Sequence, residues 1–236
     1  MKVSIIIPTM EERKEMLKEA LVSICDQTVQ PSEIIVFNGD KDVKKKLNES
    51  IAKSIGDAFL VFCDDDELEP TYIEQTTNVM EERGADIVGT WIRNFGDDTK
   101  IHGFTKFPPG TSLTRKSIWK KVGGYDIRIK LGGDYDFFTM CKQSGAKIEI
   151  IPQPLLNYRR HPHNWSSKES WEESNKIIHQ KYKKQRDKAI EDYGFKLGYH
   201  CQQCGKRIPD WTSGIDLRRQ CFCSPKCYEQ FTQKDK

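Results

Sequence analysis

The sequence predicts an α/β fold with a doubly wound, mainly parallel sheet. Three runs rich in apolar and β-branched residues, 3–7, 33–37 and 57–63, have the length and composition of buried strands. Between them lie two segments with apolar residues at helical spacing. Since the connections are short, right-handed crossovers place these strands in one parallel sheet with helices on both of its faces.

The elements can be justified in chain order. Pro8 and Thr9 end the first strand, and Thr9 with Glu12 fits a capping box that begins a helix. The apolar face of that helix comprises Leu17, Ala20, Leu21, Ile24 and Cys25. The second predicted helix repeats Val43, Leu47, Ile51 and Ile55 every four residues. The later expected elements are a helix from Pro70, a strand at 86–91, a short helix at 117–122, a helix opened by Gly132-Gly133-Asp134, a strand at 147–151 and a long basic helix from Ser166.

Three consecutive carboxylates, Asp64-Asp65-Asp66, follow the third strand directly. We expect them at the carboxyl edge of the sheet, where open α/β folds bind ligands. Adjacent carboxylates repel one another, and a divalent cation with oxygen ligands would relieve that repulsion. The alternative is a helix cap or a solvated loop. The glycine-rich phosphate loops of dinucleotide and P-loop enzymes are absent from the sequence, which disfavours both classes.

The amino-acid composition is typical of a globular protein with a polar surface. The 236 residues carry a formal net charge of +3, with 31% charged and 36% hydrophobic residues. No apolar run approaches the ~20 residues that span a bilayer. The apolar stretch at the N-terminus is too short for a signal peptide, so we expect a cytoplasmic protein without a membrane span.

Four motifs occur in the order seen in family 2 glycosyltransferases. They are Val-Ser-Ile-Ile-Ile-Pro-Thr at 3–9, the acidic run with Glu67-Leu68-Glu69-Pro70, Gly123-Gly124-Tyr125-Asp126, and Gly133-Asp134-Tyr135-Asp136. The chain resembles that family over roughly residues 1–165. The resemblance implies a GT-A fold and an enzyme that moves a sugar from a nucleotide-sugar donor to an acceptor hydroxyl.

The resemblance also implies a metal site. The acidic run is similar to the Asp-x-Asp motif, which holds Mn²⁺ or Mg²⁺ against the donor diphosphate. Asp66 is the expected principal ligand, and Asp64 or Asp65 would touch the ribose or the metal. Cys63 stands where many relatives have a further Asp, so the register stays open by one residue.

Asp134 is similar to the catalytic base of the family. It would take the proton of the acceptor hydroxyl as that oxygen attacks the anomeric carbon, which inverts the anomeric centre. The alternative is that Asp134 only caps a helix. Asp136, at the same helix start, is expected to be structural.

Four residues match positions that contact the nucleotide base: Pro8, Thr9, Glu11 and Asn38. Asn38 replaces the usual Asp, and because an amide both donates and accepts, the base stays open. A UDP-sugar is the first expectation.

The segment 157–164 resembles one that closes the active site in relatives. His161 or His163 could complete the metal shell, and Arg159 or Arg160 could meet the diphosphate. Surface or packing roles are the alternative for these residues.

Five of the eight cysteines fall between 201 and 227. Cys201 and Cys204 form one close pair, and Cys223 and Cys227 form another, as in a tetrahedral structural zinc site. The Phe-Cys-Ser sequence at 222–224 resembles TRASH-type zinc fingers, with Cys221 as a spare ligand.

The expected organisation is a glycosyltransferase domain at 1–165, a basic amphipathic helix or linker at 166–197, and a zinc finger at 198–236. The acceptor is not readable: a glycan, a lipid-linked glycan, a protein or a nucleic acid would all fit. The alternative function is a binding module for nucleic acid or protein, in which the finger and the basic helix dock a partner. Acidic residues interrupt that basic helix, which favours a solvated face instead.

Overall fold

The computed structural model describes residues 1–39, 41–96, 99–103, 107–162, 164 and 172–183. The strands are β1 Val3–Thr9, β2 Glu33–Asn38, β3 Ala58–Val61, β4 Glu67–Leu68, β5 Ile87–Gly96, β6 Ile101–His102, β7 Leu113–Arg115 and β8 Ile148–Arg160. The helices are a 3-10 turn at Glu11–Arg13, α1 Lys14–Cys25, α2 Val43–Lys53, α3 Tyr72–Glu82, α4 Lys116–Val122, α5 Gly133–Gln143 and α7 Glu172–Lys181. Met1–Ile178 forms one compact unit, and His179–Lys236 belongs to a second.

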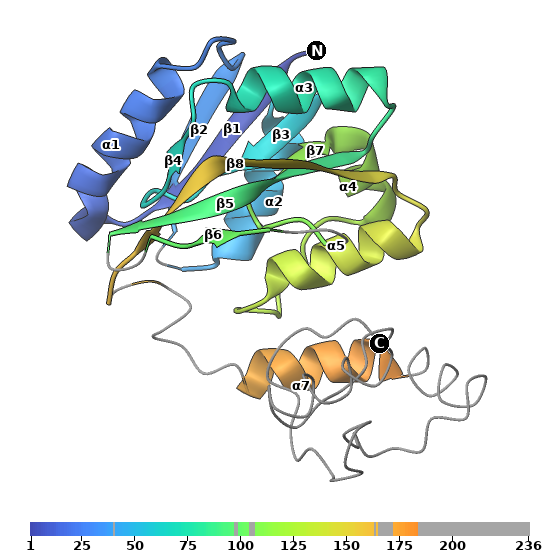
Figure 1. Ribbon diagram of the computed structural model, residues 1–236. Helices are drawn as coiled ribbons and strands as arrows, with labels where there is room; N and C mark the ends of the chain where they lie inside the picture. The colour runs from blue at the N-terminus through green and yellow to red at the C-terminus, as the bar shows by residue number, and fades with distance from the viewer. Residues whose placement is uncertain (40, 97–98, 104–106, 163, 165–171, 184–236) are drawn as a thin grey trace, which may run out of the picture. The chain divides into compact units, whose positions relative to one another are not determined.

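One mixed sheet organises the first unit, with the strand order β2-β1-β3-β7-β5-β8-β4 and β6 beside β5 (Figure 1). Its longest pairings, β1 with β2 and β5 with β8, are parallel. The short strand β7 runs antiparallel between β3 and β5. The predicted mainly parallel α/β fold is therefore confirmed.

Helices cover both faces of the sheet (Figure 1). On one face α1 and α3 pack on β1 and β3, and the core there includes Ile5, Ile7, Ile24, Leu60 and Tyr72. On the other face α2, α4 and α5 pack on the same strands through a second cluster, which includes Ile6, Ile51, Phe59, Ile118 and Phe137. Alternate residues of β1 thus enter opposite cores, which is why the strand reads as one continuous apolar run.

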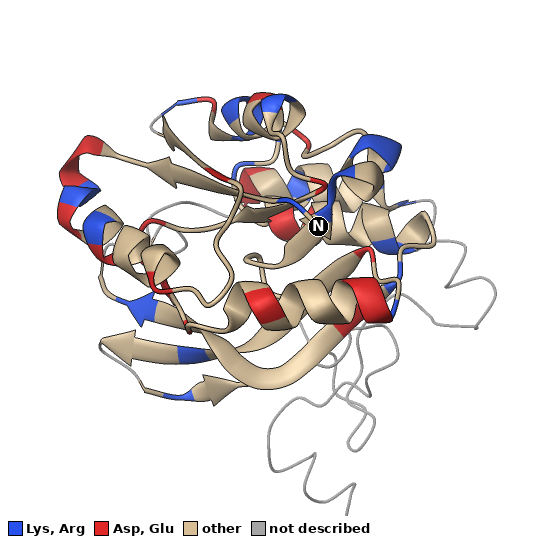
Figure 2. Ribbon diagram, turned by 90° about the horizontal axis from the view of Figure 1, so that it is seen from above, with Lys and Arg blue, Asp and Glu red and all other residues tan. Residues whose placement is uncertain are grey.

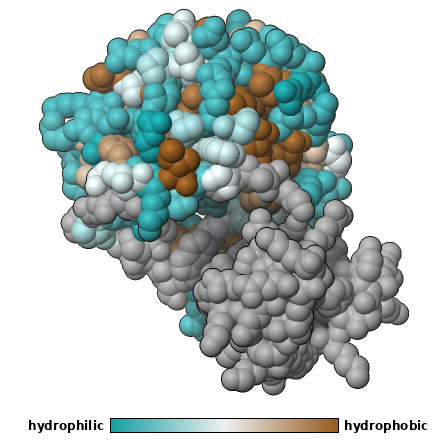
Figure 3. All heavy atoms as spheres, viewed as in Figure 1, coloured by the Kyte–Doolittle hydropathy of each residue, from teal (hydrophilic) through white to brown (hydrophobic). Residues whose placement is uncertain are grey.

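The charged residues lie mainly on the helices and connecting segments, whereas the strands carry few of them (Figure 2). The visible described surface is mostly hydrophilic, with apolar residues in small groups (Figure 3). Among the described helices, none has the length and apolar character needed to cross a bilayer.

Two local predictions need correction. The capping box is wrong: Thr9 is the last residue of β1, and its hydroxyl donates to Asp64 instead of to a helix start. The helix begins later, at Lys14, after the 3-10 turn. The strands predicted at 86–91 and 147–151 are also longer than expected, because β5 and β8 continue as a pair to Gly96 and Arg160.

Candidate functional site

The acidic run lies in the turn between β3 and β4, at the edge where β1 and β2 also end. The Gly39 N–H donates to the Thr9 carbonyl at 2.7 Å, which joins the ends of β1 and β2 at this edge. The three carboxylate residues are buried, with relative exposures of 2% for Asp64, 6% for Asp65 and 1% for Asp66. Burying three ionised carboxylates is costly unless positive or hydrogen-bonding groups accompany them.

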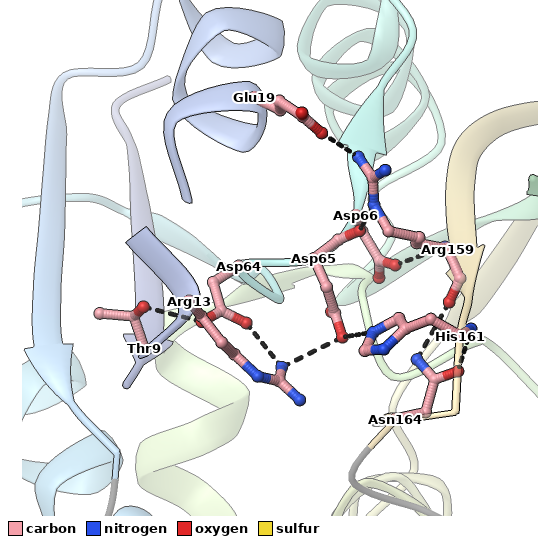
Figure 4. Close-up of polar contacts among 9 residues, drawn as sticks. All are labelled: Thr9, Arg13, Glu19, Asp64, Asp65, Asp66, Arg159, His161 and Asn164. Atoms are coloured by element: carbon pink, nitrogen blue, oxygen red, sulfur yellow. Dashed lines mark hydrogen bonds and ion pairs between the residues drawn. The ribbon is translucent and has the colours of Figure 1, made fainter. Parts of the chain in front are cut away.

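Asp64 is held by protein groups at both of its oxygens (Figure 4). The Thr9 hydroxyl donates to Oδ2 at 2.7 Å, and Arg13 Nη1 donates to Oδ1 at 2.9 Å. Burial opposes the charge of Arg13, but the hydrogen bond to Asp64 and the charges of Asp65 and Asp64 raise its pKa overall. Arg13 therefore stays charged and neutralises this end of the run.

Asp65 lies between the side chains of Arg13 and His161 (Figure 4). Its Oδ2 accepts a hydrogen bond from the same Arg13 Nη1 at 3.1 Å and lies 3.0 Å from His161 Nε2. Asn164 fixes His161, because its Oδ1 accepts the His161 backbone N–H at 2.9 Å. The end of β8 is thereby tied to the acidic run.

Asp66 has the weakest compensation of the three. Its Oδ1 accepts the backbone N–H of Arg159 at 3.0 Å. Burial, followed by repulsion from Asp65, raises the pKa of Asp66 well above its usual value, although Arg159 opposes that rise. A cation beside Asp66 would relieve the repulsion and displace the proton.

Arg159 braces the run from the side of β8. Its Nε donates to the Asp65 carbonyl at 2.9 Å, and its Nη2 pairs with Glu67 at 3.1 Å and with Glu19. Its guanidinium also lies 4.4 Å from the centroid of the Phe95 ring. Arg160, in contrast, is exposed, and its guanidinium lies 5.8 Å from the ring centroid of Tyr158.

Three side chains have ligand atoms close enough to share one metal ion: Cys63, Asp65 and Asp66, whose candidate ligand atoms lie within 4.8 Å of one another. The two carboxylates suit a hard divalent ion such as Mn²⁺ or Mg²⁺, whereas the Cys63 thiol, whose pKa is raised by burial and by the neighbouring carboxylates, is a softer donor beside them. Asp64 and His161 lie outside this group and instead contact Arg13 and Asp65.

Asp134 lies in the first turn of α5 and is exposed, whereas Asp136 in the same turn is fully buried. Within the described part of the chain, the Asp134 carboxylate makes no hydrogen bond or ion pair. Gly110 leaves room beside it, since a Cβ at that position would lie 2.9 Å from Asp134 Oδ2. Gly132, at φ 70°, adopts the left-handed conformation that begins the helix.

The residues expected to contact the nucleotide base are spread along the same edge. Pro8 and Thr9 end β1, and Asn38 ends β2 with its carbonyl accepting a hydrogen bond from Lys46 Nζ at 2.9 Å. Glu11 is exposed and forms an ion pair with Lys14.

Sequence reasoning missed two residues of this region, Arg13 and Lys44. Arg13 had no motif to signal it, because its partners lie more than fifty residues away in the sequence. Lys44, in the first turn of α2, lies close enough to Asp134 and Cys63 for their charges to act on it. His163, the basic residues from 184 onward, and the cysteines Cys201, Cys204, Cys221, Cys223 and Cys227 fall outside the described residues.

Comparison with known proteins identifies the fold. No protein-family model and no curated protein sequence matches the chain. Crystal structures of TarS from S. aureus do match: TarS 1-349 with a TM-score of 0.58 at 13% identity, over 67% of this chain and 60% of that one. The complex of TarS 1-349 with UDP-GlcNAc gives a TM-score of 0.60 at 13% identity, over 72% and 62% of the two chains.

The complex of TarS 1-349 with UDP gives a TM-score of 0.54 at 12% identity, over 84% of this chain and 76% of that one. In the first of these matches, the chain spans about three fifths of the length of the TarS fragment. At such low identity the likeness concerns the fold, which is of the GT-A type, as the family resemblance implied.

Proposed function

We propose that the protein is a metal-dependent, inverting glycosyltransferase that moves a sugar from a nucleotide-sugar to an acceptor hydroxyl. The observation that carries this proposal is that two carboxylate sites of different character lie near the same lysine. A metal-ligand group, buried Asp65 and Asp66 with Cys63 beside them, and an exposed carboxylate, Asp134, both lie near Lys44. One site suits the diphosphate of the donor, and the other suits the acceptor.

The proposed metal ligands are Asp66 and Asp65, with Cys63 beside them. The donor set fits a divalent cation, because it combines two carboxylates within ligand distance and one of them, Asp66, has little protein compensation. Such an ion supplies Lewis-acid stabilisation of the diphosphate leaving group. Asp64, engaged by Thr9 and Arg13, is assigned a structural role in place of the direct ligand role expected from the sequence.

Asp134 is the proposed general base. As the acceptor oxygen bonds to the anomeric carbon, its proton passes to the Asp134 carboxylate, and the bond between the sugar and the diphosphate breaks. An exposed carboxylate without a protein partner in the described structure is available for an incoming hydroxyl. Direct displacement of this kind inverts the anomeric centre.

The proposed donor is a UDP-sugar. TarS, a GT-A-type glycosyltransferase, has been crystallised with UDP-GlcNAc and with UDP, which supports uracil as the base. Pro8, Thr9 and Asn38, at the ends of β1 and β2, are the proposed neighbours of that base, with Glu11 at the rim. His161 orients Asp65, and Arg159 braces Asp66; Arg160, being exposed, remains the candidate arginine for the diphosphate.

The test is donor turnover with a panel of nucleotide-sugars, in Mn²⁺, in Mg²⁺ and after chelation. We expect UDP release from one UDP-sugar in Mn²⁺, and loss of that release on chelation. Asp66→Ala and Asp134→Ala are both expected to abolish transfer. Undiminished activity in both variants would refute the proposal.

The rest of the chain is proposed to be separate from this chemistry. We assign residues 1–165 to catalysis, 166–197 to a helical linker and 198–236 to a zinc finger with Cys201, Cys204, Cys223 and Cys227 as ligands. Metal analysis of the purified protein tests the finger: one zinc per chain is expected, and Cys204→Ser should lower it.

A further inference from the structure

Lys44 packs against the start of α5, although it belongs to α2. A Cβ built on Gly133 would lie 2.7 Å from Lys44 Cε and 3.1 Å from Lys44 Nζ. The lysine side chain therefore crosses directly over the backbone of Gly133, the residue before Asp134. Any larger residue at 133 would displace it.

Within the described residues, the ammonium group of Lys44 lies near the Asp134 carboxylate and the Cys63 thiol without bonding to either. Burial lowers the pKa of Lys44, while the charges of Asp134 and Cys63 oppose that effect. Nζ lies 5.7 Å from the ring centroid of Tyr125. Within the described residues it makes no hydrogen bond or ion pair, so its three N–H donors are available to an anion.

The position of Lys44 indicates which anion it would bind. Cys63 begins the proposed metal-ligand group, and Asp134 is the proposed base, so Lys44 lies near both. In the proposed reaction, the bond that breaks joins the sugar to a diphosphate held on the metal side, while the acceptor enters on the Asp134 side. Negative charge therefore develops on a phosphate oxygen in the region between these two groups.

We propose that Lys44 is the cation that hydrogen-bonds the diphosphate of the donor and stabilises it as the leaving group. This inference rests on the proposed function. When the bond from the anomeric carbon to the phosphate oxygen breaks, its electron pair stays on that oxygen, and Lys44 donates a hydrogen bond to the diphosphate without giving up its proton. The proton of the acceptor goes to Asp134, so the step balances.

A purely electrostatic role is the competing explanation. Lys44 could act only through its charge on the neighbouring Asp134, in which case its removal would lower turnover and leave nucleotide affinity unchanged. The two roles differ in their ligand dependence, because only a phosphate contact distinguishes UDP from uridine.

The experiment measures binding of UDP, pyrophosphate and uridine to the full chain by calorimetry in Mn²⁺. Lys44→Met is compared with Lys45→Met, a neighbouring exposed lysine of the same helix. We expect Lys44→Met to weaken UDP and pyrophosphate by about 10- to 100-fold, the range for a hydrogen bond to a charged group. Uridine binding should not change, and Lys45→Met should bind all three ligands as the wild type does.

Thermal melting shows whether a change in ligand affinity reflects misfolding of the variant. Removal of a partly buried charge without a bonded partner should leave the melting temperature of Lys44→Met at or above the wild-type value. Unchanged UDP affinity in Lys44→Met, or equal weakening of UDP and uridine, would overturn the inference. A wild-type protein that binds neither UDP nor pyrophosphate would instead contradict the proposed function, and the inference with it.

Discussion

The acidic run and Asp134 are both carboxylate sites at one end of the fold, but their surroundings differ. Asp64 and Asp65 are buried and held by Thr9, Arg13 and His161. Asp134 is exposed at a helix start, with Lys44 nearby. A fixed, neutralised site can present a metal with defined geometry, whereas an exposed carboxylate can receive a proton. In the proposed function, the same residue type would therefore serve binding in one place and proton transfer in the other.

The strongest challenge to this comparison is Asp134→Asn. Asparagine keeps the shape of the side chain but cannot accept a proton, so transfer should fall by about 10²- to 10⁴-fold. UDP affinity in Mn²⁺ should stay within the wild-type range, because Asp134 lies outside the metal-ligand group. Steady-state kinetics and calorimetry measure the two effects. If UDP affinity fell as steeply as turnover, the separation of the two sites would be wrong.

The second prediction concerns Asp66→Asn. Loss of this ligand should weaken Mn²⁺ binding by at least about 100-fold, as measured by calorimetry. The metal-free protein should instead melt about 2–4 °C higher, because burial and the charge of Asp65 make ionisation of Asp66 unfavourable in the folded protein. Asparagine Oδ1 can still accept the Arg159 N–H, so the fold should be kept.

The pH dependence of the stability gain in Asp66→Asn tests whether ionisation of Asp66 causes it. The pKa of Asp66 is raised in the folded protein, so its stabilising protonated form is lost as the pH rises through that value. The gain in stability from Asp66→Asn should therefore be largest at high pH. It should disappear below about pH 4, where the carboxyl is neutral in both folded and unfolded chains. A gain that grew toward low pH would contradict this explanation.

How much of this arrangement the sequence could predict depends on the range of the contacts. Buried strands such as β1 and β3 are continuous apolar runs, so these strands and the acidic edge were readable. The extension of β8 was hidden, because Pro152 and Pro154 signal the end of a strand. In the structure the register shifts between Thr90–Ile151 and Trp91–Pro154, which accommodates both prolines.

The partners of the carboxylates were less readable than the carboxylates themselves. Asp64, Asp65, Asp66 and Asp134 stand in motifs, whereas Arg13 reaches Asp65 only after the chain has folded over fifty-two positions. The side chain of Lys44 likewise meets Gly133 through packing of α2 on α5. Local patterns predict which residues carry the chemistry, but tertiary packing decides which cations accompany them.

The third prediction breaks the neutralisation of the acidic run. Arg13→Met removes the guanidinium that bridges Asp64 and Asp65 and leaves buried carboxylates less compensated, at a cost of about 3 kcal/mol in the free energy of unfolding. Lys14→Met, which breaks the adjacent exposed pair with Glu11, should cost close to nothing. Urea denaturation measures both. Equal losses of stability in the two variants would show that Arg13 does not stabilise the buried acidic run.

The smallest predicted effect isolates burial at a single hydrogen bond. Thr9 and Thr28 each donate a hydroxyl to a carboxylate oxygen at 2.7 Å, Thr9 to buried Asp64 and Thr28 to Glu74 in an exposed contact. Thr9→Val should lower the free energy of unfolding by about 1–2 kcal/mol, because water cannot readily replace the lost donor at Asp64. Thr28→Val should lower it by a few tenths at most, about the scale of an exposed polar contact. Urea midpoints of the two variants measure the difference, and a larger loss at Thr28 would mean that the Thr9 hydroxyl does not stabilise the acidic run.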